Sequence, residues 1–270
     1  MSNRINEKFN QLKSENRGGF IPFIAAGDPN LQATKELILK LAKKGASIIE
    51  LGVPFSDPVA DGVTIQASAE RALRNPINVG NILQIVSEVR TEFCETPIIL
   101  FSYFNPILQF GLKKFAEKAN ESGVDGILIT DLVPEEAEEF RNILAEKDLA
   151  LIMLAAPTSS DERLRKICEK ASGFVYAVSR AGVTGARTAL SNDAENLVER
   201  LRKYTNLPIA VGFGISTAEQ VLETWKYADA AVVGSAIVAE MMRLAPNADE
   251  VSDDFVGKIG EFAGNLLPTI

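Results

Sequence analysis

Short apolar runs alternate along the chain with longer segments in which apolar residues recur every three or four positions. The runs are apolar almost throughout, which is typical of parallel β-strands covered on both faces. They predict eight strands, at residues 20–25, 47–53, 97–103, 126–130, 150–156, 174–179, 208–213 and 230–234. The segments between them predict amphipathic helices, as in the stripe formed by Leu112, Phe115 and Ala119.

Two helical segments fall outside this simple alternation. One is a leading helix at 5–14, with Phe9 and Leu12 on one face, and the other lengthens the connection 64–95 between the second and third strands. Eight strands alternating with helices predict an α/β fold, a single (β/α)8 TIM barrel domain over residues 1–270 with these two additions. A doubly wound open sheet is the alternative, because the number of strands alone does not exclude it.

Sequence signals mark where several helices begin. Residues 159–162 and 216–219 both read Ser-x-x-Glu, the form of a capping box in which side-chain oxygens bind free main-chain N–H groups. Pro134 predicts a third helix start, and Asp28, which precedes a proline, predicts a fourth.

The composition excludes several classes of protein. A net charge of −8 and a pI near 4.9 argue against a nucleic-acid partner, because no basic stripe stands out. The chain has no histidine, which removes Ser–His and Cys–His catalysis and most zinc or iron sites, so no metal is expected. Acid–base chemistry must therefore come from carboxylates, Lys, Tyr or Cys.

The same composition predicts a soluble, cytoplasmic protein with no membrane partner. The longest apolar stretch, 230–239, is too short to span a bilayer, and the first residues lack the apolar core of a signal peptide. Cys94 and Cys168 are interpreted as reduced, small apolar residues rather than a disulfide bridge.

The stretch 48–62 joins a strand that looks buried to two carboxylates. Glu50 stands inside the predicted strand, where an unpaired carboxylate carries a large desolvation cost. Burial raises the pKa of a carboxylate, which suits proton transfer near neutral pH. Asp61 follows in the loop before the next helical segment. The alternatives are a structural salt bridge for Glu50 and a helix N-cap for Asp61.

Glycines cluster directly after the last three predicted strands, in the loops that form the active face of a TIM barrel. Gly185, Gly214 and Gly234 stand in those loops, and Ser235 can present the N-terminus of a helix. Main-chain N–H groups that approach closely can bind an oxyanion without a lysine, so the glycines predict a phosphate site. Each glycine taken alone also has a backbone explanation.

Three further features belong to the same face. Tyr176, in the sixth strand, either packs in the core or contacts substrate. The loop 103–111 is more apolar than a solvated loop should be, which favours contact with another protein over folding onto the core. The segment 180–190 is rich in small residues and is predicted to form a mobile lid beside the phosphate site.

The sequence Ile-Glu-Leu-Gly-Val-Pro-Phe-Ser-Asp-Pro-Val-Ala-Asp-Gly at 49–62 resembles the signature of the tryptophan synthase alpha chain family. Segments 176–185, 212–214 and 234–235 match that family in the same order, and the similarity covers nearly the whole chain. The resemblance implies a (β/α)8 barrel that cleaves indole-3-glycerol phosphate to indole and glyceraldehyde 3-phosphate. It also implies an α2β2 complex with a beta chain, and no cofactor here, because pyridoxal phosphate belongs to the beta chain.

The resemblance also implies roles for individual residues. Glu50 is similar to the family's acid–base residue, Asp61 to its partner at the indole nitrogen, and Tyr176 to an active-site tyrosine. The expected indole and phosphate contacts are Phe23, Phe101, Phe213, Thr184, Gly185, Gly214, Gly234 and Ser235. The segment 104–110 and the turn at 57–58 fall where the beta chain docks.

Two departures from the family affect the lining of the pocket. Ala25 and Ala26 stand where a Thr-Leu pair is frequent, and Phe101 stands where Leu is often found. A different phosphate-binding barrel enzyme, such as a phosphosugar isomerase or an aldolase, is an alternative function. No predicted strand contains the lysine that a Schiff-base aldolase needs. A non-catalytic partner that only activates a beta chain is the other alternative.

Overall fold

The computed structural model describes residues 3–92, 94–178, 192–212, 214–247 and 251–268. The strands within them are β1 (Gly19–Ala25), β2 (Ile49–Gly52), β3 (Ile98–Ser102), β4 (Gly126–Ile129), β5 (Ala150–Ala155), β6 (Val175–Val178), β7 (Ile209–Gly212) and β8 (Ala230–Val233). Each strand runs parallel to the next, and β8 pairs with β1, so the sheet is a closed barrel. This closure confirms the TIM barrel and rules out the open sheet.

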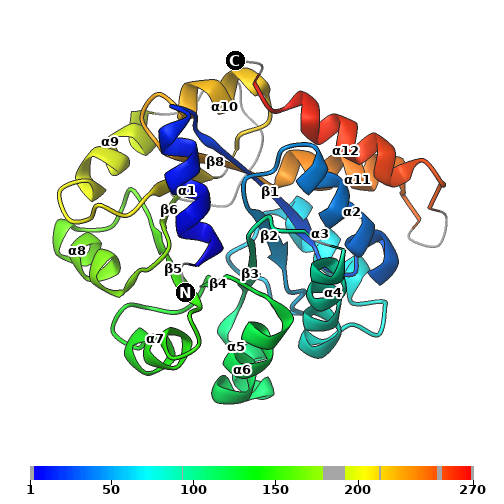
Figure 1. Cartoon of the computed structure of the whole chain (residues 1–270), viewed down its shortest axis with the longest axis horizontal. Coiled ribbons are helices and arrows are strands. Elements are labelled where there is room, and N and C mark those ends of the chain that lie inside the picture. The colour runs from blue at the N-terminus through cyan, green and yellow to red at the C-terminus, as the bar shows by residue number, and fades with distance from the viewer. Residues whose placement is uncertain (1–2, 93, 179–191, 213, 248–250, 269–270) are drawn as a thin grey trace.

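Apart from α1, the helices of the described residues surround the barrel in chain order (Figure 1). They are α1 (Arg4–Ser14), α2 (Leu31–Lys43), α3 (Val63–Ala72), α4 (Val79–Thr91), α5 (Phe104–Phe110), α6 (Leu112–Ser122), α7 (Ala137–Ala145), α8 (Asp161–Lys170), α9 (Asn192–Leu201), α10 (Ala218–Thr224), α11 (Ser235–Leu244) and α12 (Phe255–Asn265). The leading helix α1 and the two helices α3 and α4 between β2 and β3 confirm the predicted additions. Strand ends differ from the predicted ones by at most two residues.

The barrel wall separates two hydrophobic cores. Inside, apolar side chains from the strands pack with Ile5, Phe9 and Leu12 of α1, which lies across one end of the barrel (Figure 1). The ring of Phe9 is 5.7 Å from that of Phe174. Outside, a larger core that includes Phe115 fills the space between the strands and the surrounding helices. Since α1 closes the amino ends of the strands, the carboxyl ends remain for a site.

The strand register places several important side chains at one level of the barrel. Phe23 of β1 pairs with Glu50 of β2, and Glu50 pairs with Ile99 of β3. On the other side of the barrel, Tyr176 of β6 pairs with Ala210 of β7. Short strands with this register hold Glu50 rigidly, because its main chain is bonded on both sides.

The apolar segment that the sequence analysis interprets as a loop is a helix, α5. Pro106 stands in its first turn, where a missing N–H breaks no helical bond. Phe104 packs on Phe140 with ring centroids 5.8 Å apart, and Phe110 packs on Phe115 at 6.4 Å. The prediction of a loop was therefore wrong, and both terminal rings contribute to the protein's own core.

Helix starts lie close to the predicted residues but not at them. Ser160 caps α8 and Thr217 caps α10, each one residue later than the capping boxes indicate, and each hydroxyl accepts a main-chain N–H. Helix α7 begins at Ala137, after a turn that contains Pro134. Two adjacent hydroxyl residues leave the position of a cap ambiguous in sequence, because either can act as N-cap.

Asp28, predicted to start a helix, is instead a fully buried carboxylate, and Asn30 is the residue that caps α2. Asp28 accepts hydrogen bonds from Arg71 Nε, at 2.9 Å, and from the Ser68 hydroxyl, both on α3. Arg71 also donates to the main-chain oxygen of Ala245, just after α11. This buried ion pair fastens α3 to the loop after β1 and to the end of α11.

Three general findings concern the described residues as a whole. None of their helices combines the length and the apolar character needed to cross a bilayer. Nor do three or more His, Cys, Asp or Glu side chains within them form a group that could hold a metal ion. Cys94 and Cys168 are free and buried, which confirms their interpretation as reduced, apolar-type residues.

Candidate active site

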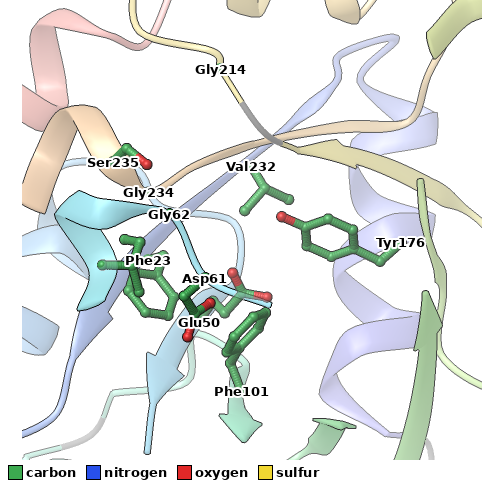
Figure 2. A pocket seen from close by; sticks show the side chains of 11 residues that line it. Phe23, Glu50, Asp61, Gly62, Phe101, Tyr176, Gly214, Val232, Gly234 and Ser235 are labelled. Atoms are coloured by element: carbon green, nitrogen blue, oxygen red, sulfur yellow. The ribbon is translucent and has the colours of Figure 1, made fainter. Parts of the chain in front are cut away.

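A pocket opens at the carboxyl ends of the strands, opposite the end that α1 closes. It contains about 460 Å³ of empty space, part of which is open to solvent. Its wall is formed by Phe23, Glu50, Asp61, Gly62, Ile65, Phe101, Tyr176, Gly214, Val232, Gly234 and Ser235. Figure 2 shows the two carboxylates in the middle of this wall, with aromatic rings on both sides of them.

Most of the site residues expected from the sequence meet in this pocket. Those that line it are Glu50, Asp61, Tyr176, Phe23, Phe101, Gly214, Gly234 and Ser235. Thr184, Gly185 and Phe213 lie outside the described residues, as does the segment 180–190 expected to form a lid. The pocket thus joins residues from β1, β2, β3, β6 and β8 and from the loops that follow β2, β7 and β8.

Glu50 is buried in the middle of β2, with 2% of its surface exposed. Its Oε1 atom has no hydrogen-bond partner among the described residues. Burial, together with the negative charge of Asp61, raises the pKa of Glu50 to about 8. No Lys or Arg of the described residues neutralises it, so the described part of the chain supplies no structural salt bridge to Glu50.

Asp61 lies in the loop before α3 and is 7% exposed. Gly62 is the N-cap of α3, and no side chain caps that helix, so the capping role considered for Asp61 is also wrong. Burial raises the pKa of Asp61 to about 6, and a hydrogen bond from Tyr103 opposes this rise. Near pH 7, therefore, Glu50 is mostly protonated and Asp61 is mostly ionised.

Two phenylalanine rings form an apolar wall beside the carboxylates. Phe23 and Phe101 meet edge to face, with centroids 5.5 Å apart and planes at 80°. A side chain at Gly52 would collide with Phe23, because a Cβ there would lie 2.6 Å from the ring. Glycine at this position of β2 is therefore what lets the Phe23 ring occupy the pocket.

Tyr176 of β6 approaches the carboxylates from the other side of the barrel (Figure 2). It is 4% exposed, and burial together with the charges of Glu50 and Asp61 raises its pKa well above the ordinary value. A Cβ at Gly212 would lie 2.0 Å from the Tyr176 hydroxyl. Gly212 is thus explained by the space that Tyr176 needs, while Gly214 in the next turn lines the pocket.

The upper part of the pocket has features suited to an anion. Gly214 adopts a φ of +84° that favours glycine, and no atom lies within 4 Å of a Cβ built there. Gly234 precedes α11 with no side-chain cap, and Ser235 is the first residue of that helix. The unbonded N–H groups of a helix N-terminus carry partial positive charge, so this end of the pocket can bind an oxyanion.

One polar contact of the site was not predicted from the sequence. Tyr103, which directly follows β3, donates its hydroxyl hydrogen to Asp61 Oδ2 at 3.1 Å and accepts the Ala60 N–H at 2.9 Å. Its position at the end of a strand was the available signal, but the apolar sequence around it indicated packing instead. Ile65 and Val232, which complete the apolar lining, were missed for the same reason.

A comparison with known families shows to which family the chain belongs. The sequence model of the tryptophan synthase alpha chain family matches residues 9–265. The chain belongs to this family. It is therefore a carbon–carbon lyase of tryptophan biosynthesis that acts on indole-3-glycerol phosphate.

Relatives and solved structures agree with the family assignment. The tryptophan synthase alpha chain of Geobacter sulfurreducens is 48% identical over 264 residues, which are 97% of this chain and 99% of the relative. The subunit alpha structure from Legionella pneumophila has a TM-score of 0.87 at 34% identity, covering 98% of this chain and 97% of that one. A chain of the tryptophan synthase α2β2 complex from Pyrococcus furiosus has a TM-score of 0.84 at 41% identity, covering 92% and 97%.

Proposed function

We propose that Glu50 and Asp61 are the acid and the base with which this chain cleaves indole-3-glycerol phosphate. The observation that carries the proposal is the presence of two buried carboxylates in one pocket, neither with a cationic partner among the described residues. Their pKa values, about 8 and about 6, give one proton donor and one proton acceptor near neutral pH. Separated pKa values in a shared site are what acid–base catalysis requires.

The reaction then needs four proton transfers. Asp61 accepts the proton of the indole N–H while Glu50 donates its proton to C3, which gives the 3H-indole tautomer. The carbinol hydroxyl next gives its proton to the Glu50 carboxylate, and the bond from C3 to the glycerol chain breaks as the aldehyde forms. The electron pair of that bond returns to the ring, and Asp61 gives its proton back to nitrogen. Both carboxyl groups end in the state in which they began.

Substrate binding follows from the two halves of the pocket. The indole ring is proposed to lie against Phe23 and Phe101, where flat apolar surfaces bury it beside the carboxylates. The phosphate is proposed to bind at Gly214, Gly234 and Ser235, at the N-terminus of α11. Thr184, Gly185 and Phe213 belong to the same proposal as further contacts, and Tyr176 as a group that packs against the reacting ring.

The decisive experiment measures indole released from indole-3-glycerol phosphate by the purified chain, alone and with a beta chain. We expect release in both conditions. A phosphosugar isomerase is the competing function, and a triose phosphate or pentose phosphate substrate tests it in parallel. A Schiff-base aldolase is disfavoured, because none of the strands β1 to β8 contains a lysine. Indole release that requires the beta chain at every substrate concentration would favour the non-catalytic alternative.

The proposal extends to assembly. We infer that the chain binds a beta chain in an α2β2 complex, through α5 and the turn at 57–58, with pyridoxal phosphate confined to the beta chain. The α2β2 complex from Pyrococcus furiosus supports this assembly by similarity. Val59 in the loop before α3, Val63 of α3 and Leu108 of α5 add apolar surface, being 81%, 72% and 49% exposed. A cytoplasmic location belongs to the same proposal and is supported by the family.

Sedimentation of the chain mixed with a purified beta chain tests the assembly. We expect a species of two alpha and two beta chains, and a loss of that species when Leu108→Glu puts a charge on the exposed face of α5. Gln84→Glu on the exposed face of α4 is the matched control. Independent sedimentation of the two wild-type chains would reject this part of the proposal and leave the lyase assignment intact.

A further inference from the structure

We propose that Tyr103 is a positioning residue for the lyase reaction: its hydroxyl fixes the orientation of the Asp61 carboxylate and favours the ionised form. The inference rests on the proposed function, because it assigns Tyr103 its role through the base Asp61. Tyr103 does not line the pocket, so it acts through Asp61 rather than on the substrate.

The hydrogen bonds of the hydroxyl determine where its proton points, and they include one with the Thr130 side chain that favours the ionised phenol. The Ala60 N–H donates to Tyr103 Oη at 2.9 Å, and an N–H group cannot accept. The hydroxyl proton is therefore free to point at Asp61 Oδ2, 3.1 Å away. This bond occupies Oδ2 and leaves Oδ1 as the carboxylate oxygen available to a ligand. The carboxylate thus has a defined reactive oxygen before substrate arrives.

Tyr103 also ties the loop that carries Asp61 to the barrel wall. Its ring packs on Phe55 at the start of this loop, with centroids 5.2 Å apart. The other hydrogen bonds found for residues 55–61 within the described structure join the loop to itself or to Gln66 of α3. Tyr103 is buried and directly follows β3, so its position is set by a strand rather than by the loop. The barrel therefore holds both ends of the loop through one side chain.

The charges around Asp61 make the hydrogen bond from Tyr103 important for the ionisation of Asp61. Within the described residues, the titratable groups that face Asp61 are Glu50 from β2, Tyr176 from β6 and Tyr103 itself. All three are acids, and none supplies a positive charge. The Tyr103 hydroxyl is therefore the group that favours the anion, while burial favours the neutral acid. Without the hydroxyl, Asp61 would hold its proton to a higher pH.

The test is Tyr103→Phe, which removes the hydroxyl and keeps the ring on Phe55. We measure kcat/KM for indole-3-glycerol phosphate from pH 5 to pH 9. The wild-type profile is expected to rise as Asp61 ionises near pH 6 and to fall as Glu50 ionises near pH 8. In the variant the acid limb should move up by about one pH unit, since a bond to the charged form is lost. Activity should then fall about tenfold at pH 5 and much less at pH 8.

Two further measurements separate this role from a purely structural one. Titration of labelled Asp61 by carboxyl NMR reads its pKa without any turnover, and thermal unfolding reads stability. Tyr227→Phe is the control, because Tyr227 precedes β8 at the opposite end of the barrel. The inference stands if the acid limb and the Asp61 titration both move upward in Tyr103→Phe and neither moves in Tyr227→Phe.

Two results would overturn the inference. An unchanged acid limb with an unchanged Asp61 titration would overturn the inference, and so would an even loss of activity across the whole pH range. If Tyr103→Phe does not fold, Phe55→Leu loosens the same anchor while keeping the hydroxyl, and it should broaden the Asp61 signal without moving its pKa. A wild-type chain that releases no indole would reject the proposed function, yet the NMR titration would still decide the bond to Asp61.

Discussion

Two buried carboxylates, Asp28 and Glu50, differ in what surrounds them rather than in how deeply they lie. Asp28, after β1, is 0% exposed, and Glu50, in β2, is 2% exposed. Burial raises the pKa of both. Asp28 receives hydrogen bonds from Ser68 and a charge partner in Arg71, which oppose the rise. Glu50 receives no such partner from the described residues and faces a second carboxylate, Asp61.

The difference separates a structural carboxylate from a reactive one. A buried carboxylate with a guanidinium partner has its negative charge compensated within the fold. A buried acid beside another carboxylate holds its proton until a substrate accepts it. Asp125 at the opposite end of the barrel follows the structural pattern, because Arg4 and Arg90 both contact it. Burial alone therefore does not identify a catalytic residue, and the identity of its neighbours does.

Removing the ionisable group of Glu50 should affect turnover more strongly than any other substitution proposed for this chain. Glu50→Gln keeps the size of the side chain but cannot donate or accept the transferred proton. We expect kcat/KM for indole-3-glycerol phosphate to fall by about 10³-fold with the fold intact. Steady-state assays of indole release check the loss, and circular dichroism checks the fold.

Glu36→Gln, on the exposed face of α2, is the matched control and should keep full activity. A Glu50→Gln enzyme within tenfold of wild type would make Glu50 a structural residue.

The structural carboxylate should show the opposite phenotype. Arg71→Met keeps much of the side-chain volume and leaves Asp28 buried without its charge partner. We expect the free energy of unfolding to fall by about 3–5 kcal/mol, because an uncompensated buried charge remains. Urea unfolding at pH 7 measures the loss.

Arg165→Met is the control for this experiment, since Arg165 pairs with Glu169 on the exposed face of α8. It should change stability little. If Arg71→Met were as stable as Arg165→Met, then the Asp28–Arg71 pair would not hold α3 in place, and the contrast with Glu50 would lose its structural half.

The role of Glu50 could be predicted from the sequence, whereas the ion pair between Asp28 and Arg71 could not, for a physical reason. Glu50 interrupts an apolar strand, so its burial follows from the residues next to it. Asp28 and Arg71 meet across 43 positions of sequence, and their pairing depends on how α3 packs. Tyr103 was concealed in the same way, because its contact with Asp61 spans 42 positions. Patterns along the chain predict burial and strand ends, whereas contacts between loops arise only from the folded barrel.

The same limit explains the error over α5. Apolar residues on several sides of seven positions show no helical period that a short window can detect. The strands were easier, because each is an apolar run bounded by turns. Their order around the barrel follows from chain order, and chain order alone therefore predicts that the loops after β2, β7 and β8 share one face.

The raised pKa of Glu50 should also make the stability of the fold depend on pH. The folded-state pKa of Glu50 is about 8, against 4.5 for the ordinary side chain. Between these values the unfolded chain is ionised while the folded chain keeps its proton. Glu50 therefore costs no stability below about pH 4.5, and its cost grows as pH rises until it is complete above pH 8. We expect wild type to lose a few kcal/mol relative to Glu50→Gln over this window.

Urea unfolding of both proteins at half-unit steps from pH 5 to pH 9 measures this difference, and subtracting one curve from the other removes the other titrating groups. Asp28 should contribute nothing to the difference curve. A difference curve that is flat from pH 5 to pH 9 would mean that Glu50 is ionised in the folded protein, and its role as proton donor would then fail.

Substitutions in α5 should change stability only slightly, and packing and partner binding should divide between different residues of this short helix. Phe104 packs on Phe140, so Phe104→Ser should lower the free energy of unfolding by about 1–2 kcal/mol. Leu108 is 49% exposed, so Leu108→Ser should leave stability nearly unchanged and weaken binding of the beta chain. This corrects the expectation from sequence that the rings at 104 and 110 serve the partner and not the core.

Thermal unfolding of the isolated chain and calorimetric titration with the beta chain measure the two effects. Equal loss of stability in both variants would show that α5 is one packed unit with no separate docking face.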